Sequence, residues 1–363
     1  MKVAVFSSTP FDRQFLDAAN RGQHELRYLD CRLTVATTAL AKGSTAVCLF
    51  ANDEANATTM MAFAHMGVQL IALRAAGFDN VDLHAARAHG IRVARVPAYS
   101  PNAVAEHAFA LLLSLNRKVH VAYERVRRGN FALDGLMGFD LVGKSFGVVG
   151  VGNIGSVAAK IARGFGCEVL GADPVLRDDC RGIVDYVELE ELLERSDIVS
   201  LHCPLNDSTR HLIGERELAR MKPGAMLINT SRGAVIDTSA VIASLASSHL
   251  GGLAIDVYEG ERSLFFEDRS DRQIADEQFA RLLAFPNVLV TGHQGFFTTE
   301  AMTEIARTTL KNIDAFEQSG RPLHQVTPPL PDPAPRPGTE RKSGSLSLSC
   351  EGDTKRFRET ANP

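Results

Sequence analysis

The sequence predicts an α/β protein with two mostly parallel β-sheets, because short apolar runs alternate with helical patterns along most of its length. The first series of strand-like segments covers residues 2–6, 45–51, 68–73 and 91–96, and helical patterns at 57–65 and 82–89 lie between them. The second series covers residues 145–149, 167–172, 198–203, 225–229, 252–257 and 287–291. Strands joined through helices pair in parallel, so each series predicts one sheet.

Two helical patterns lie outside these series, and a segment without periodicity follows them. Residues 102–128 carry apolar side chains at helical spacing after a proline, which predicts one long helix that links the two parts. That helix either lies in the core or packs one face against a second subunit. Residues 301–317 predict a last helix. Residues 327–363 are rich in Pro, Ser and charge, and they predict a disordered tail with no part in the chemistry.

Composition predicts a soluble protein inside the cell. The formal net charge is −4 and the Lys and Arg residues are scattered, so we expect no nucleic-acid partner. No apolar stretch approaches the roughly 20 residues that cross a bilayer, and the N-terminus resembles a first strand rather than a signal peptide. The six cysteines lie far apart, which predicts reduced thiols in a cytoplasmic protein and no metal site.

A glycine-rich turn indicates a dinucleotide cofactor. Gly150, Gly152 and Gly155 form the pattern G-x-G-x-x-G between an apolar strand and a helical stretch, which is the context that dinucleotide binding requires. The glycines would permit a tight turn, a close approach of the backbone to the pyrophosphate, and close packing of helix on strand. The N-terminus of the helix would offer unpaired N–H groups to the phosphates.

The next strand ends at Asp173, about 20 residues after the turn, where an acid would bind the ribose hydroxyls of the cofactor. A carboxylate at this position repels a 2′-phosphate, so the sequence favours NAD over NADP. A nicotinamide cofactor in turn implies hydride transfer.

Three polar residues follow successive strands of the second series, where ligands gather in open α/β sheets. Arg232 could bind a substrate carboxylate with two hydrogen bonds and polarise the adjacent carbonyl group. His293 is a candidate general acid and base near neutral pH. Glu261 would favour the protonated imidazole of His293. Each residue alone could be an ordinary surface residue, and only the combination indicates a reaction on a 2-keto acid.

These motifs resemble those of the D-2-hydroxyacid dehydrogenases. The resemblance covers about residues 1–320 and rests on Val-Gly-Asn-Ile-Gly at 151–155, Asn-Thr-Ser-Arg-Gly at 229–233, Asp-Val-Tyr-Glu-Gly-Glu at 256–261 and Gly-His-Gln at 292–294. The separations match as well, since the family places its Glu 29 positions after the Arg (261 − 232 = 29) and its lactate branch places the His 61 positions after it (293 − 232 = 61). The catalytic residues implied are Arg232, Glu261 and His293.

The resemblance also implies a set of binding residues. For NAD these are Gly150, Gly152, Asn153, Ile154, Gly155, Asp173, Cys203, Pro204, Thr209, Thr230, Ser231 and Asp256. For the substrate they are the backbone at Ala76 and Gly77, the side chain of Arg232, and pocket walls at Tyr99 and Phe296, although ordinary packing explains the last two equally well. Cys203 is a backbone contact rather than a nucleophile in this interpretation.

The family's topology implies two domains separated by a cleft. Residues 1–99 plus 299–326 would form a flavodoxin-like substrate domain, because the final helix returns to the first domain, and residues 100–298 would form the Rossmann-type NAD domain. Within the family, Ser-Leu-Phe-Phe-Glu-Asp at 263–268 is similar to the fermentative D-lactate branch.

The expected reaction is the reversible, NADH-dependent reduction of pyruvate to D-lactate by a homo-oligomeric enzyme, a dimer or a tetramer. Two alternatives stay open at this point. The substrate could be a different 2-keto acid, such as a phenyl or branched-chain one. The chain could instead be a non-catalytic, NAD-sensing binding protein similar to the corepressors that share this fold.

Overall fold

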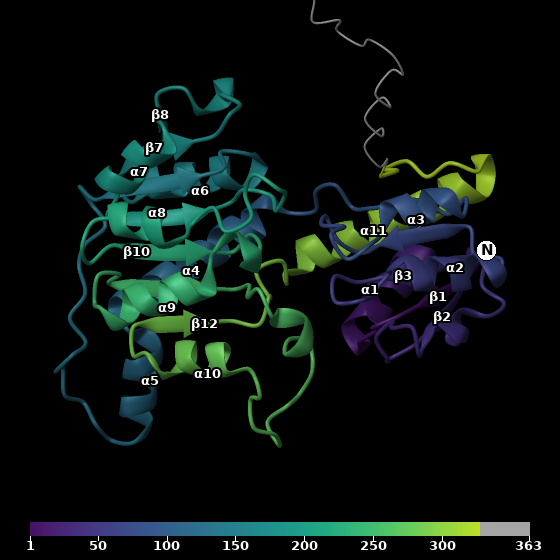
Figure 1. The fold of residues 1–363 in the computed structure, drawn as a ribbon, viewed down its shortest axis with the longest axis horizontal. Coiled ribbons are helices and arrows are strands. Elements are labelled where there is room, and N and C mark those ends of the chain that lie inside the picture. The colour runs from purple at the N-terminus through teal and green to yellow at the C-terminus, as the bar shows by residue number, and fades with distance from the viewer. Residues whose placement is uncertain (327–363) are drawn as a thin grey trace, which may run out of the picture. The chain divides into compact units, whose positions relative to one another are not determined.

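The computed structural model describes residues 1–326, and the first part of this chain forms a parallel sheet of five strands (Figure 1). The strand order is β2-β1-β3-β4-β5. The strands are β1 (Lys2–Val5), β2 (Glu25–Tyr28), β3 (Ala46–Leu49), β4 (Leu70–Leu73) and β5 (Arg92–Ala94). Their helices are α1 (Pro10–Asn20), α2 (Ala57–His65), α3 (Leu83–Ala88) and the final helix α11 (Thr299–Ser319).

Helices cover both faces of this sheet, which explains why β3 and β4 are apolar along their whole length and β1 is apolar after Lys2. One face packs on α1 and α11, through residues such as Leu16, Leu310 and Ile313. The other face packs on α2 and α3, through Met60, Phe63 and Ala86.

The second part forms a parallel sheet of seven strands in the order β12-β11-β10-β9-β6-β7-β8. The strands are β6 (Ser145–Val149), β7 (Glu168–Ala172), β8 (Asp185–Tyr186), β9 (Ile198–Leu201), β10 (Met226–Asn229), β11 (Gly252–Ile255) and β12 (Val288–Val290). The helices are α4 (Pro101–Arg117), α5 (Val119–Arg127), α6 (Asn153–Gly164), α7 (Leu189–Arg195), α8 (Glu215–Arg220), α9 (Thr238–Ala246) and α10 (Glu277–Ala284). Side chains of α4 and α6 cover one face, and those of α7 to α10 cover the other.

The predicted two-sheet architecture is confirmed, but three elements differ from the sequence-based expectation. Strands β2 and β8 were not predicted, because one is an edge strand of alternating exposure and the other has two residues. The single helix predicted over 102–128 is wrong, since α4 ends at Arg117, Lys118 lies in the left-handed region (φ 50°), and α5 starts at Val119. The side chains of α4 are largely buried and those of α5 are not, so only α4 has core packing to hold its direction.

The domain boundaries derived from the resemblance stay a prediction, which the packing of α11 supports. This helix follows the second sheet in the chain, yet its apolar side chains join the core of the first sheet. The tail predicted at 327–363 lies outside the described residues. Within residues 1–326, no helix is both long enough and apolar enough to span a bilayer.

A buried ion pair stabilises the carboxyl ends of the five-stranded sheet. The Arg74 side chain, which follows β4, is 2% exposed and pairs with Asp12 at the start of α1. The guanidinium group also donates a hydrogen bond of 2.6 Å to the Phe6 carbonyl oxygen. Loss of Asp12 would leave the buried guanidinium without the carboxylate that contacts it directly.

We therefore expect Asp12→Ala to lower the free energy of unfolding by about 3–5 kcal/mol. Asp30→Ala is a matched control, because Asp30 pairs with Arg13 on the surface, and it should cost within about 1 kcal/mol. Urea denaturation of both variants measures the difference. Equal losses of unfolding free energy in the two variants would show that the buried ion pair stabilises the protein no more than the surface pair does.

Candidate active site

The glycine turn between β6 and α6 has the geometry that a pyrophosphate group needs. Gly150 has φ +90°, and a Cβ atom there would lie 2.6 Å from the backbone nitrogen of Cys203. A Cβ atom at Gly155 would lie 2.0 Å from the Gly150 carbonyl oxygen, so glycine alone permits this packing. At Gly152, in contrast, a Cβ atom would meet open space. The backbone is therefore accessible at the point where a phosphate would approach.

The residues around this turn fit a dinucleotide. Helix α6 begins after Gly152 without a side-chain cap, so its first N–H groups are available to an anion. Ile154, in the first turn of α6, is half-buried, and the Asn153 side chain accepts a hydrogen bond of 2.9 Å from Arg177. Asp173 is half-buried directly after β7 and accepts a hydrogen bond from the Val175 amide (2.7 Å). Because β7 pairs with β6, with Ala172 opposite Val149, Asp173 lies at the same edge of the sheet as the glycine turn.

Other predicted cofactor residues follow β9 and β10. Cys203 is buried, and burial raises the pKa of its thiol to about 11, so the thiol stays protonated and is a poor nucleophile. Thr209 closes the same loop by donating a hydrogen bond of 2.6 Å to the Pro204 carbonyl oxygen. Thr230 is also buried, and its hydroxyl oxygen has no hydrogen-bond partner among residues 1–326. A buried hydroxyl group without a partner is a site that a bound ligand could satisfy.

Arg232 is held by the turn that follows β10. The buried Asn229 accepts hydrogen bonds from the amide (2.9 Å) and hydroxyl (2.8 Å) of Ser231, and it donates one to the Arg232 carbonyl oxygen (2.9 Å). The guanidinium lies beside Gly77 of the first sheet, where a Cβ atom would approach Arg232 Nη2 to 2.0 Å. Arg232 and the Ala76–Gly77 backbone therefore lie together, as the resemblance implies.

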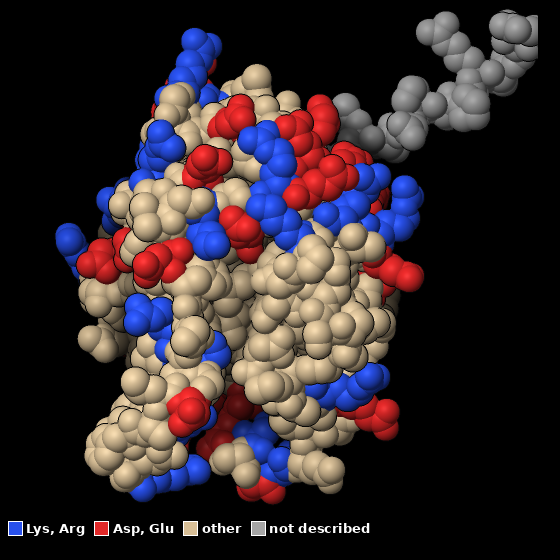
Figure 2. All heavy atoms as spheres, turned by 90° about the vertical axis from the view of Figure 1, so that its left-hand side faces the viewer, with Lys and Arg blue, Asp and Glu red and all other residues tan. Residues whose placement is uncertain are grey.

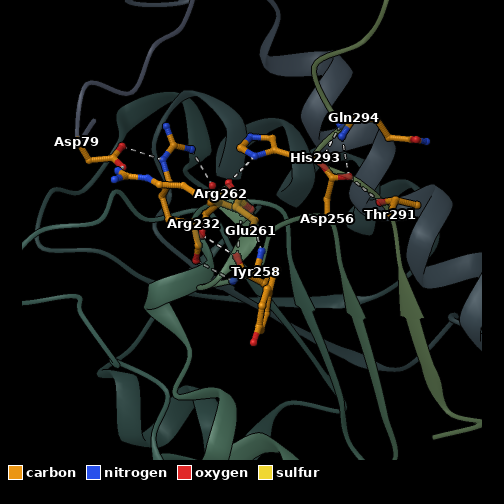
Figure 3. A network of polar contacts seen from close by, with 12 residues as sticks. Asp79, Arg232, Asp256, Tyr258, Glu261, Arg262, Thr291, His293 and Gln294 are labelled. Carbon is orange, nitrogen blue, oxygen red and sulfur yellow. Dashed lines mark hydrogen bonds and ion pairs between the residues drawn. The ribbon is translucent and has the colours of Figure 1, made fainter. Parts of the chain in front are cut away.

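Glu261 and His293 form a hydrogen-bonded pair at the ends of β11 and β12 (Figure 3). Glu261 Oε1 lies 2.8 Å from His293 Nδ1, and each side chain is less than one-fifth exposed. The other carboxylate oxygen, Oε2, accepts a hydrogen bond from the Tyr258 amide (2.9 Å), which fixes its orientation. The two residues predicted to act as a unit are therefore in direct contact.

Asp256 organises the loop that carries His293. Its carboxylate accepts hydrogen bonds from the amides of Gln294 (2.8 Å) and Gly295 (2.7 Å) and from the Thr291 hydroxyl (2.6 Å). Burial acts to raise the pKa of Asp256, but these hydrogen bonds and one from His107 outweigh it, and the pKa lies below its usual range. Asp256 thus stays ionised. The structure gives its carboxylate a positioning role in addition to the proximity to nicotinamide that the resemblance implies.

Aromatic side chains surround His293. The Phe296 ring lies 6.5 Å from the His293 ring and 6.5 Å from the Tyr99 ring, measured between ring centres. Burial raises the pKa of Tyr99, so its phenol stays neutral. Tyr99 and Phe296 thus belong to one aromatic group next to His293, and their role as pocket walls stays a prediction. Within residues 1–326, no three His, Cys, Asp or Glu side chains gather as a metal site would require.

Sequence reasoning missed two polar neighbours of the site, Asp79 and His107. Asp79 lies 3.6 Å from Arg232 Nε and 3.4 Å from Arg262 Nη2 (Figure 3), and so joins the arginine to the residue after Glu261. His107 on α4 lies 3.0 Å from the Thr291 hydroxyl and 3.3 Å from Asp256. Asp79 follows Gly77 by two positions, but no pattern in the sequence links it to Arg232, which lies 153 positions later (232 − 79 = 153).

Comparisons with known proteins agree with this geometry. The family model for the NAD-binding domain of D-isomer-specific 2-hydroxyacid dehydrogenases matches residues 109–295. The chain is 50% identical to 2-hydroxyacid dehydrogenase A of Aspergillus oryzae over 320 residues, which cover 87% of this chain and 92% of the relative. It is 47% identical to D-lactate dehydrogenase of Escherichia coli, over 88% and 97% of the two chains.

The chain belongs to the D-2-hydroxyacid dehydrogenase family.

A solved structure supports the same membership. The structure described as the pyruvate reductase of Chlamydomonas reinhardtii superposes with a TM-score of 0.84 at 45% identity, over 89% of this chain and 98% of that one. As a member of the family, the protein is an NAD-dependent 2-hydroxyacid dehydrogenase, which confirms the predicted cofactor and enzyme class. The roles of individual site residues stay proposals.

Substitution of Gly155 tests the cofactor site of this dehydrogenase. Because a Cβ atom there would collide with the Gly150 carbonyl, Gly155→Ala should distort the turn and weaken NADH binding by roughly tenfold or more, a loss of about 1.4 kcal/mol for each factor of ten. Gly164→Ala in the same helix meets open space and should leave binding unchanged. Fluorescence titration with NADH measures both. Unaltered binding by Gly155→Ala would show that the turn does not depend on glycine at this position.

Proposed function

We propose that this dehydrogenase reduces pyruvate to D-lactate, with Arg232 binding the substrate carboxylate and His293 exchanging the proton. The Glu261–His293 hydrogen bond is the observation that carries the proposal, because it prepares an imidazole for proton transfer beside an arginine. The balanced reaction is pyruvate plus NADH plus H⁺ giving D-lactate plus NAD⁺.

Arg232 would orient the substrate. Its planar guanidinium can hold a carboxylate with two hydrogen bonds, while the neighbouring backbone at Ala76–Gly77 offers further contacts. The positive charge also polarises the adjacent carbonyl group. The carbonyl oxygen is then directed toward His293.

His293 would act as general acid in the reductive direction. The carboxylate of Glu261 can only accept, so His293 Nδ1 carries a proton toward it, and Nε2 is left to donate to the substrate oxygen. Glu261 stabilises the charged imidazole before the proton leaves. In the oxidative direction the same pair accepts the proton from the hydroxyl group.

The reduced cofactor, when bound, supplies a hydride to the carbonyl carbon. The glycine turn and Asp173 would bind it in the arrangement described above. Closure of the predicted cleft would exclude water from the reacting groups.

Two findings favour pyruvate as the substrate. Several relatives and solved structures similar to this chain are described as D-lactate dehydrogenases or as a pyruvate reductase. The aromatic rings packed around His293 also favour a substrate with a small apolar substituent. We place the enzyme in the cytoplasm, in keeping with its nicotinamide cofactor and with the five cysteines of residues 1–326, which form no disulfide.

The direct test is NADH oxidation with a series of 2-keto acids, followed by chiral analysis of the product. Pyruvate should give the highest kcat/KM and D-lactate as the product. Glyoxylate, 2-ketobutyrate and phenylpyruvate complete the series. Dominance of phenylpyruvate would reject the assignment to lactate, and tight NADH binding without turnover would favour a binding protein.

Removal of the imidazole tests the proton-transfer role. His293→Ala should lower kcat by roughly 100- to 10,000-fold, because general acid catalysis contributes about that much, while NADH affinity changes little. His211→Ala is a matched control, since His211 forms a similar pair with Glu259 (2.9 Å) on the surface. Steady-state rates and NADH titration measure both variants. A His293→Ala enzyme that keeps most of its turnover would refute the role.

We also propose that the enzyme is a homo-oligomer that uses α5 and the segment before β6. Helix α5 contributes no buried side chain in the described chain, and apolar side chains of the next segment are highly exposed: Phe131, Leu133, Met137 and Val142. Figure 2 shows the side on which this segment runs in Figure 1, and a broad area of it lacks charged residues. Exposed apolar surfaces of this kind favour subunit contact.

A charge within this surface should separate the subunits. Leu133→Glu should give a smaller species than the wild type by light scattering, because a charge would have to be buried in the contact. Leu323→Glu adds the same charge at another exposed leucine and should leave the assembly unchanged. A monomeric wild-type protein would overturn the proposal.

A further inference from the structure

Three phenylalanine rings form a group beside the proposed proton donor. The Phe266 ring lies 5.7 Å from the His293 ring, and the Phe50 ring lies 5.1 Å from Phe266 and 5.7 Å from Phe296, all measured between ring centres. Phe296 also lies beside the imidazole, so the three rings form one aromatic group next to His293. They come from the loop after β3, the segment after Glu261, and the loop after β12.

Phe50 is the fixed member of this group. The Arg74 guanidinium carbon lies 5.4 Å from the centre of the Phe50 ring, and Arg74 is itself buried and paired with Asp12. A cation held over an aromatic face stabilises the position of the ring. Phe50 therefore provides a rigid wall that belongs to the five-stranded sheet.

Phe266 differs from Phe50 in both exposure and backbone conformation. It is 39% exposed and has φ +67°, a conformation that side-chain-bearing residues rarely adopt. Its neighbour Phe265 faces the other way, with its ring 5.8 Å from Phe279 in the core of the seven-stranded sheet. The unusual backbone thus turns one phenylalanine of the pair inward to the core and the other across His293 to Phe50.

Two groups of the substrate have proposed positions, and together they determine where its third substituent can lie. With the carboxylate on Arg232 and the carbonyl oxygen at His293, the third substituent of the carbonyl carbon must lie among the rings beside the imidazole. We propose that Phe266 is a specificity-determining residue, which covers this position and restricts the substituent to a small group such as methyl. This inference rests on the proposed function and deepens it.

Two substitutions at Phe266 test the inference. Phe266→Ala should raise kcat/KM for phenylpyruvate and 2-ketoisocaproate relative to pyruvate by about tenfold or more, since single methylene groups in such pockets change specificity by roughly 10- to 200-fold. Phe266→Gly should produce the same shift and retain or raise Tm, because glycine adopts this backbone conformation without strain. NADH affinity, measured by fluorescence titration, should be unchanged in both variants.

Phe265→Ala is the matched control. Because Phe265 packs into the core, its loss should lower Tm and leave the substrate ratio as in the wild type. If the wild-type enzyme reduces pyruvate but neither Phe266 variant changes the ratio of kcat/KM between the bulky 2-keto acids and pyruvate, the inference about Phe266 is wrong and the proposed function stands. The same conclusion follows if Phe265→Ala changes that ratio as much as the Phe266 variants do. A wild-type enzyme without turnover on any 2-keto acid would instead reject the proposed function, and this inference with it.

Discussion

The hydrogen bond between Glu261 and His293 is the contact on which the proposed chemistry depends, and much of the surrounding structure holds it in place. The two residues follow adjacent parallel strands, β11 and β12, so their loops meet at one edge of the sheet. His293 has φ +54°, and its amide donates a hydrogen bond of 2.7 Å to the Asp256 carbonyl oxygen. The Asp256 carboxylate then binds the next two amides of the loop. A strained residue is therefore held by hydrogen bonds on both sides of it.

The same site also depends on contacts between the two sheets. Arg232 comes from the seven-stranded sheet, but its guanidinium lies against Gly77 and Asp79 of the first part of the chain. Arg262, which follows Glu261 directly, pairs with the same aspartate. The Asp79 carboxylate thus connects Arg232, which would bind the substrate, to the segment that carries Glu261. Figure 3 shows the arginine side chains between Asp79 and His293 in that view.

The sequence predicts the features that depend on local pattern. Buried parallel strands are continuous apolar runs, so β6, β9 and β10 were found within a few residues, and the glycine turn is recognisable from its position between strand and helix. The triad was found because each member follows a strand end. Lys118, Asp79 and Phe266 were not predicted. The break at Lys118 reflects packing on one side only. The Asp79–Arg232 contact joins residues 153 positions apart (232 − 79 = 153), and the Phe50–Phe266 contact joins residues 216 positions apart (266 − 50 = 216). No local pattern carries that information.

The most direct test of the central claim is a crystal structure of the enzyme with NAD and oxamate, a pyruvate analogue. The structure predicts the oxamate carboxylate on the Arg232 guanidinium and the Gly77 backbone, with the carbonyl oxygen of the analogue within hydrogen-bonding distance of His293 Nε2. It also predicts that Glu261 keeps its hydrogen bond to His293 Nδ1. An analogue bound away from Arg232, or an imidazole turned away from the carbonyl group, would contradict the proposed mechanism.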